Sequence, residues 1–325
     1  MSSLARDIPL IAPVPPGTPR PLWSVMIPTF NCAHYLRQTL ESVLAQDPGA
    51  DRMQIEVVDD CSTKDDPEAV VSEIGRGRVQ FFRQEQNRGI SHNFNTCLGR
   101  GRGELVHILH GDDYVLSGYY RKVTALAQTH PERALIATRS FFVSETNVIL
   151  GVSDRLPQYE AGDNTSSALW FTCPMQCAGI AVRRAFYEQH GGFREDLSHC
   201  ADWEMWTRAT HLGGAVVAAD VLAAYRVFET NDTSRVMRSG QNLTQRLKCI
   251  DIFGAYIPGF DATEAKIRLV WFALKQAERL KDGGDPASAK NSFKFFGALY
   301  RETTPFSTRA AYALTRRINR FFARG

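Results

Sequence analysis

The sequence lacks several features that would place it in a familiar class. No apolar run reaches about 18 residues, so no membrane-spanning helix is predicted. The net charge of +3 is too small to indicate nucleic acid as a partner. There is no Gly-x4-Gly-Lys-Ser/Thr motif, and no Gly-x-Gly-x-x-Gly follows the first predicted strand, which argues against P-loop and dinucleotide-binding folds. Hydrophobic residues make up 44% and charged residues 22%, which is typical of a folded globular protein.

The seven cysteines contain no Cys-x-x-Cys pair. This pattern favours reduced thiols in a cytoplasmic protein. A zinc site made by Cys173, Cys177, His199 and Cys200 is the alternative, although the spacing matches no common zinc pattern. Residues 1–21 contain six prolines and no basic stretch followed by a long apolar core. They are therefore interpreted as an irregular lead-in rather than a signal peptide.

Short apolar runs alternate with helical patterns from residue 23 onward. Strands are expected at 24–27, 54–58, 79–82, 105–109 and 134–137, and helices at 36–44, 66–74, 90–98 and from about 117. Further strands are expected at 141–150 and 215–227, and a helix at 202–211. The alternation predicts an α/β fold with a mostly parallel sheet flanked by helices. We expect this domain at 22–240, after the lead-in at 1–21 and before a helical C-terminal extension at 241–325.

Acidic residues follow two of these strands. Ligands of such sheets bind at the carboxyl ends of the strands, which selects the loops at 28–31, 59–62 and 110–113. Asp59 and Asp60 follow the second strand, and Asp112 and Asp113 follow the fourth. Carboxylates approach a nucleoside diphosphate through a divalent cation, which also stabilises charge on a departing diphosphate. The sequence therefore predicts a nucleotide site with Mg²⁺ or Mn²⁺ at this edge.

Six segments of the chain together resemble glycosyltransferase family 2. They are Ser24–Asn31, Val57–Thr63, Asn87–Ser91 with Asn95, Leu109–Asp113, Gly191–Phe193 and Ala201–Arg208. They cover about residues 22 to 230, in the order and at the spacing of the family. The resemblance implies the GT-A fold and an enzyme that moves a sugar from a nucleotide-sugar donor to an acceptor hydroxyl with inversion.

The resemblance also implies roles for individual residues. The donor would be bound by Pro28, Thr29, Phe30, Asn31, Asp60, Asn87, Gly89, Asn95 and Asp112. Asp112 and Asp113 would hold the cation, while Asp59 would support its own turn. Asp202 would be the general base, because inverting transfer needs one carboxylate to take the proton of the acceptor hydroxyl. Asp202 could instead merely cap its helix. Trp203 and Trp206 are expected to stack on acceptor sugars.

The sequence departs from the family pattern at four positions. His110 and Phe228 stand where the family often has a metal-site Asp and His, Ala201 stands where a Glu often precedes the base, and Phe94 replaces an Arg. Arg226 could compensate as a cation for the diphosphate. These departures leave open a catalytically impaired nucleotide-sugar-binding protein. A nucleotidyltransferase is a further alternative, disfavoured because no Gly-rich, Lys-containing loop follows the first strand.

The last 17 residues, 309–325, carry five arginines and no acidic residue. Their apolar residues fall on one helical face: Ala311, Leu314, Ile318, Phe321 and Phe322. A basic amphipathic helix suits an anionic membrane surface. Such a helix would suit an acceptor carried on a lipid and peripheral contact of a cytoplasmic protein with the inner face of the membrane. Together with the family resemblance, we expect a glycan or lipid-linked acceptor and a role in cell-surface polysaccharide biosynthesis. The alternative is a helix packed on the catalytic domain or on a partner protein.

Overall fold

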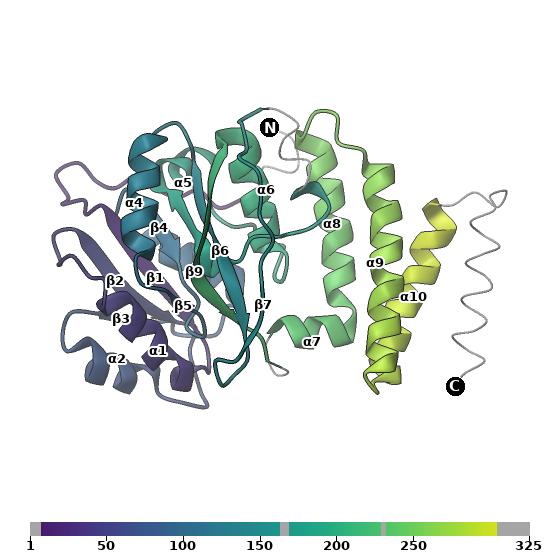
Figure 1. Ribbon diagram of the computed structural model, residues 1–325, viewed down its shortest axis with the longest axis horizontal. Coiled ribbons are helices and arrows are strands. Elements are labelled where there is room, and N and C mark those ends of the chain that lie inside the picture. The colour runs from purple at the N-terminus through teal and green to yellow at the C-terminus, as the bar shows by residue number, and fades with distance from the viewer. Residues whose placement is uncertain (1–7, 163–168, 229–231, 304–325) are drawn as a thin grey trace. The chain divides into compact units, whose positions relative to one another are not determined.

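The computed structural model describes residues 8–162, 169–228 and 232–303 (Figure 1). The chain divides into two compact units, residues 1–228 and 229–325. The boundary expected at 240/241 thus falls inside the second unit. Residues 8–21 form no helix or strand, but the carbonyl of Pro9 accepts a hydrogen bond from the Gly192 N–H at 2.8 Å. Residues 8–21 are therefore packed against the rest of the first unit.

The first unit is built on a nine-stranded sheet in the order β3-β2-β1-β4-β8-β6-β9-β5, with β7 paired to β6. The strands are β1 (Trp23–Thr29), β2 (Met53–Asp59), β3 (Gln80–Arg83), β4 (Leu105–Ile108), β5 (Tyr114–Val115), β6 (Leu135–Val143), β7 (Ile149–Val152), β8 (Ile180–Arg183) and β9 (Ala215–Arg226). The four N-terminal strands run parallel. β8 is antiparallel to both β4 and β6, and β9 is parallel to β6. The sheet is thus parallel in its first half and mixed in its second.

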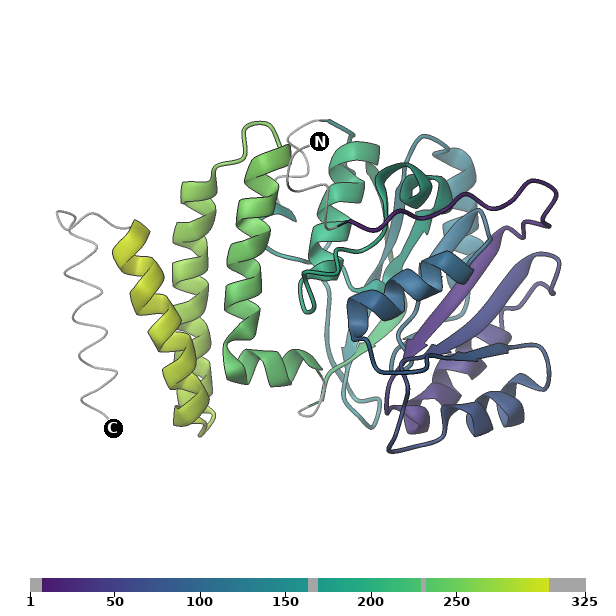
Figure 2. The same cartoon turned by 180° about the vertical axis from the view of Figure 1, so that it is seen from behind.

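Helices cover both faces of this sheet (Figures 1 and 2). They are α1 (Ala33–Leu44), α2 (Pro67–Gly75), α3 (Ile90–Arg100), α4 (Tyr119–Thr129), α5 (Arg184–His190) and α6 (Ala201–Gly213). The main apolar core joins α1, α2 and α4 to one face of β1, through residues such as Leu40, Tyr120 and Val25. α3 packs on the opposite face, seen from behind in Figure 2. β1 and β2 therefore lie between two layers of helices, and every residue of both strands is buried.

The predicted α/β fold is confirmed, including details of its helix starts. Asp66 caps α2 by accepting a hydrogen bond from the Ala69 N–H at 3.2 Å, and Pro67 occupies the first turn, where its missing N–H has no cost.

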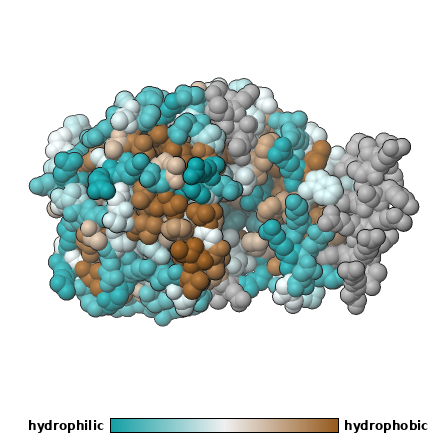
Figure 3. Space-filling view, in the orientation of Figure 1, coloured by the Kyte–Doolittle hydropathy of each residue, from teal (hydrophilic) through white to brown (hydrophobic). Residues whose placement is uncertain are grey.

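Apolar side chains gather on the face of the first unit on which β7 lies (Figure 3). β7 itself contributes exposed aliphatic side chains, among them Ile149 and Leu150.

The described part of the second unit, residues 232–303, is helical. Its described helices are α7 (Asp232–Ser239), α8 (Gln241–Tyr256), α9 (Ala262–Asp282) and α10 (Pro286–Thr303). Gln276 is buried among them and makes hydrogen bonds to Asn242 at 2.7 Å and to the Ser292 hydroxyl at 3.0 Å. Within residues 8–162, 169–228 and 232–303, no helix is both long and apolar enough to cross a membrane. The basic helix expected at 309–325 lies outside the described residues.

Candidate active site

The parallel strands bring four loops to one edge of the sheet. These loops follow β1 at 30–32, β2 at 60–66, β3 at 84–89 and β4 at 109–113. Backbone hydrogen bonds tie them together: the Gly111 N–H donates to the Pro28 carbonyl at 3.0 Å, and the Asp60 N–H donates to the Thr29 carbonyl at 2.9 Å. The segments expected to bind the donor therefore meet at one place.

Asp59 and Asn31 fix the turns that they occupy. The buried Asp59 carboxylate accepts hydrogen bonds from the Ser62 N–H at 3.1 Å and from Arg83 Nε at 2.8 Å. Asn31 adopts a left-handed φ of 51° and accepts hydrogen bonds at its Oδ1 from two backbone N–H groups of the next loop. Asp59 thus supports its turn, as expected, and Asn31 joins the loops that follow β1 and β2.

Asp60 organises the loop before α3. Its two carboxylate oxygens accept hydrogen bonds from the backbone N–H groups of Arg88 and Gly89, each at 2.9 Å. The Asn87 side-chain amide donates to the Asp60 carbonyl at 3.2 Å. Burial raises the pKa of the Asp60 carboxyl above its usual value, against the opposing effect of the two backbone hydrogen bonds. Asp60, Asn87 and Gly89, which are all expected to bind the donor, are therefore joined by hydrogen bonds. Phe30, also expected to bind the donor, has 47% of its surface exposed.

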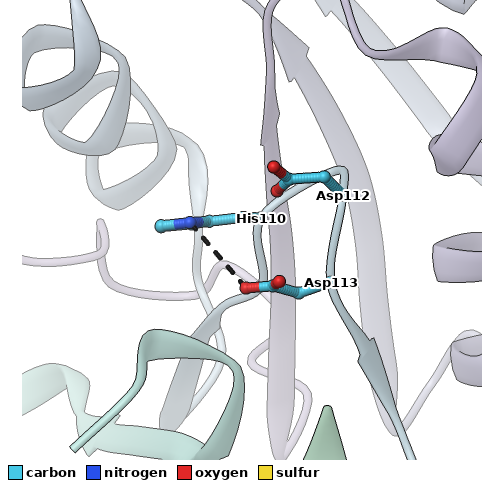
Figure 4. A group of neighbouring side chains, drawn as sticks. All are labelled: His110, Asp112 and Asp113. Carbon is cyan, nitrogen blue, oxygen red and sulfur yellow. Dashed lines mark ion pairs between the residues drawn. The ribbon is translucent and has the colours of Figure 1, made fainter. Parts of the chain in front are cut away.

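His110, Asp112 and Asp113 lie around one point in the loop after β4 (Figure 4). Each of these residues offers one possible ligand atom, and the three atoms lie within 4.8 Å of one another. Asp113 is 1% exposed, and its Oδ1 accepts a hydrogen bond from the Arg226 N–H at 2.8 Å. Its Oδ2 has no hydrogen-bond partner and lies 3.9 Å from His110 Nδ1, while His110 Nε2 is also buried without a partner. A buried polar atom without a partner is costly, so these atoms fit a cation held between them.

Burial also shifts the pKa values of this cluster. It raises the pKa of the Asp113 carboxyl well above the usual range, and the nearby negative charge of Asp112 adds to that effect. Burial lowers the pKa of His110, against the attraction of Asp112. The imidazole is therefore neutral at pH 7 and offers a nitrogen lone pair. Among the described residues this is the one group of three or more such side chains, so the zinc alternative at Cys173, Cys177, His199 and Cys200 gains no support.

Asp202 lies in the first turn of α6, is partly exposed, and accepts a hydrogen bond from the Trp203 N–H at 2.7 Å. The Cys177 thiol is buried. Burial raises the pKa of Cys177, and the charges of Asp202 and Asp113 raise it further. Both carboxylates therefore lie within electrostatic range of one thiol.

Aromatic rings link the same two parts of the site. The His110 ring stacks on Phe94 with centroids 5.2 Å apart, Phe94 contacts Phe193 at 4.9 Å, and Phe193 contacts Trp206 of α6 at 5.7 Å. The loop after β4 and the helix that carries Asp202 are thus joined through a continuous packed line of side chains.

Comparison with known proteins identifies the family. The family model described as "Glycosyl transferase family 2" matches residues 24–191, about half of the chain. The chain belongs to glycosyltransferase family 2. It is a glycosyltransferase with the GT-A fold, and the comparisons give no support to a binding protein without activity. They likewise give no support to the nucleotidyltransferase alternative.

Two relatives of this family 2 glycosyltransferase and one solved structure show the extent of the similarity. An uncharacterised glycosyltransferase of Haemophilus influenzae is 25% identical over 239 residues, which cover 70% of this chain and 71% of that one. The UDP-Glc:alpha-D-GlcNAc-diphosphoundecaprenol beta-1,3-glucosyltransferase WfaP of Escherichia coli is 24% identical over 50% of this chain and 61% of its own length. The mannosyltransferase PcManGT of Pyrobaculum calidifontis, solved with GDP-Man and Mn²⁺, superposes with a TM-score of 0.55 at 19% identity, covering 97% of this chain and 84% of that one.

Three side chains of this glycosyltransferase require a correction of the expected roles. Trp203 and Trp206 are only 3% and 2% exposed, and the Trp203 indole donates to the Leu169 carbonyl at 2.6 Å. Neither ring has a face open to an acceptor sugar, so both belong to the core of the transferase. Asn95 is expected from the resemblance to line the donor, but its amide exchanges two hydrogen bonds of 2.8 Å with the backbone of Phe193. It holds that turn in place.

Arg226 is neither a surface residue nor an available cation. It is 1% exposed, and its guanidinium donates to the Asp112 carbonyl at 2.9 Å, to Gln38 Oε1 at 2.8 Å and to two carbonyls in the loop before β7. The charge also lies 4.6 Å from the Tyr35 ring centroid, and Tyr35 contacts Phe228 at 5.3 Å. Since its donors are engaged, Arg226 fixes the Asp112–Asp113 turn instead of binding a diphosphate.

One residue that supports the site is not evident from the motifs. Thr39 of α1 is buried, and its hydroxyl lies 3.0 Å from the Gly111 carbonyl and 2.7 Å from the Asp113 carbonyl. It therefore holds the metal loop from the side of α1. The sequence indicates this role in one way: Thr39 is a polar residue on the apolar face of a predicted helix, next to Leu36, Leu40 and Val43.

Proposed function

We propose that this glycosyltransferase transfers a sugar with inversion from a nucleotide-diphosphate sugar to a hydroxyl of a glycan or lipid-linked acceptor, in cell-surface polysaccharide biosynthesis. The observation that supports this most is the cluster of His110, Asp112 and Asp113 at the edge of the sheet where the donor loops meet, in which Asp113 Oδ2 is buried without a partner. Packed aromatic rings from His110 to Trp206 link this cluster to α6, the helix that carries Asp202, although the two lie far apart in the sequence.

The proposed donor side is formed by the loops at 28–31 and 87–89 together with Asp60, with Mg²⁺ or Mn²⁺ held by Asp112 and Asp113. Asp113 Oδ2 is buried without a partner, and this supports a cation at that position. The superposed mannosyltransferase was solved with GDP-Man and Mn²⁺, which is consistent with this class of donor. When bound, the cation would stabilise negative charge on the departing diphosphate.

The proposed base is Asp202. In inverting transfer the acceptor hydroxyl attacks the anomeric carbon directly, and its proton passes to a carboxylate within hydrogen-bond reach. No carboxylate is needed as a nucleophile, because there is no covalent intermediate. The N-terminal end of α6 carries partial positive charge, which favours the ionised carboxylate that accepts the proton.

The experiment that tests this proposal is a screen of nucleotide-sugars with Mn²⁺ or Mg²⁺. We expect one donor to release its nucleoside diphosphate in a cation-dependent manner, and the transferred sugar to carry the opposite anomeric configuration by NMR. Retention of the donor configuration would contradict the inverting mechanism. Activity that persists fully in EDTA would contradict the role of the cation.

A lipid-linked acceptor is proposed because the relative WfaP is named for transfer to a diphosphoundecaprenol-linked sugar. Contact with the membrane would come from the basic segment at 309–325. We expect a chain truncated after Thr308 to lose binding to anionic vesicles, because the five arginines of that segment supply the attraction. Co-sedimentation with anionic vesicles measures this, and neutral vesicles serve as the control. Unchanged binding would remove the membrane contact from the proposal.

A further inference from the structure

The metal cluster includes a nitrogen atom that can ligate a cation. His110 Nδ1 lies 3.9 Å from Asp113 Oδ2 (Figure 4). Bonds of about 2.1 Å from one cation to a nitrogen and an oxygen span up to about 4.2 Å, so a single ion fits between these atoms. Asp113 is 1% exposed, and its Oδ2 is unpartnered and faces the imidazole. The acidic cluster is thus accompanied by a buried polar atom directed at the same point.

Phe94 restrains the imidazole ring. The two rings stack with centroids 5.2 Å apart and planes inclined by 26°. Phe94 is itself 2% exposed and packs on Phe193, so it cannot readily move aside. Residues 94 and 110, two of the positions at which the sequence departs from the family pattern, are therefore in direct contact. The aromatic residue at 94 fixes the ring that brings nitrogen to the cluster.

An imidazole changes which cation such a cluster prefers. Mg²⁺ is a hard cation that favours oxygen ligands, whereas imidazole nitrogen suits transition metals. We propose that His110, positioned by Phe94, makes this site select Mn²⁺ or a later transition metal over Mg²⁺. The inference rests on the proposed metal site of the transferase and narrows it to a class of cation.

The test measures metal binding without turnover. The purified full chain is titrated with Mn²⁺, with free Mn²⁺ followed by electron paramagnetic resonance, alone and with UDP or GDP, and Mg²⁺ is then added as competitor. We expect the wild type to favour Mn²⁺, and His110→Asp to reduce the ratio of Mn²⁺ to Mg²⁺ affinity by about 10- to 100-fold. His110→Asn, which offers an oxygen without a buried charge, should shift the ratio in the same direction and covers the case in which His110→Asp does not fold.

Two further variants distinguish the positioning of the His110 ring from its identity as a nitrogen ligand. Phe94→Leu should weaken Mn²⁺ binding while the preference for Mn²⁺ remains, because the imidazole is still present. His130→Asp is the matched control, since His130 lies outside the cluster at the end of α4. An unchanged ratio in both His110 variants, a wild type that prefers Mg²⁺, or no Mn²⁺ binding under any condition would overturn the inference. Failure to find a sugar donor would bear on the proposed function alone.

Discussion

Replacing Asp202 with Asn is expected to lower the turnover number by about 10²- to 10⁴-fold, because the acceptor hydroxyl loses the carboxylate that takes its proton. The substitution preserves the size of the side chain and its hydrogen bond from the Trp203 N–H. Donor binding should therefore stay within about twofold, since the base acts only on the acceptor. The measurement combines steady-state release of nucleoside diphosphate with calorimetric titration of the donor.

Asp51→Asn is the control for this substitution. Asp51 is exposed and precedes β2, at the end of the strand opposite to the loop that carries Asp60. We expect its turnover number to match the wild type. If Asp202→Asn retained full turnover, Asp202 would merely cap its helix, and another group would have to accept the proton.

The positions of the first strands could be predicted from the sequence because both faces of those strands are buried. Runs expected at 24–27 and 54–58 correspond to Trp23–Thr29 and Met53–Asp59. By contrast, the segment expected to form one strand at 141–150 contains the end of β6 and the start of β7. A turn separates these two strands, and in it Asn147 has a left-handed φ of 64°. The antiparallel insertion of β8 between β4 and β6 could not be predicted, since strand order depends on contacts distant in sequence.

The loops of the site could be predicted, whereas the direction of individual side chains could not. From Ala201 to His211, every residue of α6 except Asp202 is buried. A helix buried on all sides shows no periodicity that could distinguish a core Trp from one facing a ligand. The same limit applies to Asn95 and Arg226, whose partners lie on elements remote in sequence.

Replacing Arg208 with Met is expected to lower the free energy of unfolding by about 3–5 kcal/mol, because it leaves a buried carboxylate without its partner. Arg208 Nε donates to Glu204 Oε1 at 2.9 Å, and neither residue is more than 4% exposed. The guanidinium also donates to the carbonyls of His190 at 2.6 Å and Gly192 at 2.7 Å. It thereby joins the helix that carries Asp202 to the turn held on its other side by Asn95. Urea denaturation followed by circular dichroism measures the loss.

Arg37→Met is the matched control, because Arg37 pairs with Glu73 at the surface of the same unit, where ion pairs contribute little. Its unfolding midpoint should stay close to that of the wild type. Adding Glu204→Leu to Arg208→Met should recover part of the lost stability, since no unpaired buried charge remains. If Arg208→Met were as stable as Arg37→Met, the buried pair would not be what fixes α6 and the Gly191–Gly192 turn, and the position of Asp202 would depend on the aromatic contacts of Trp206 and Phe193 instead.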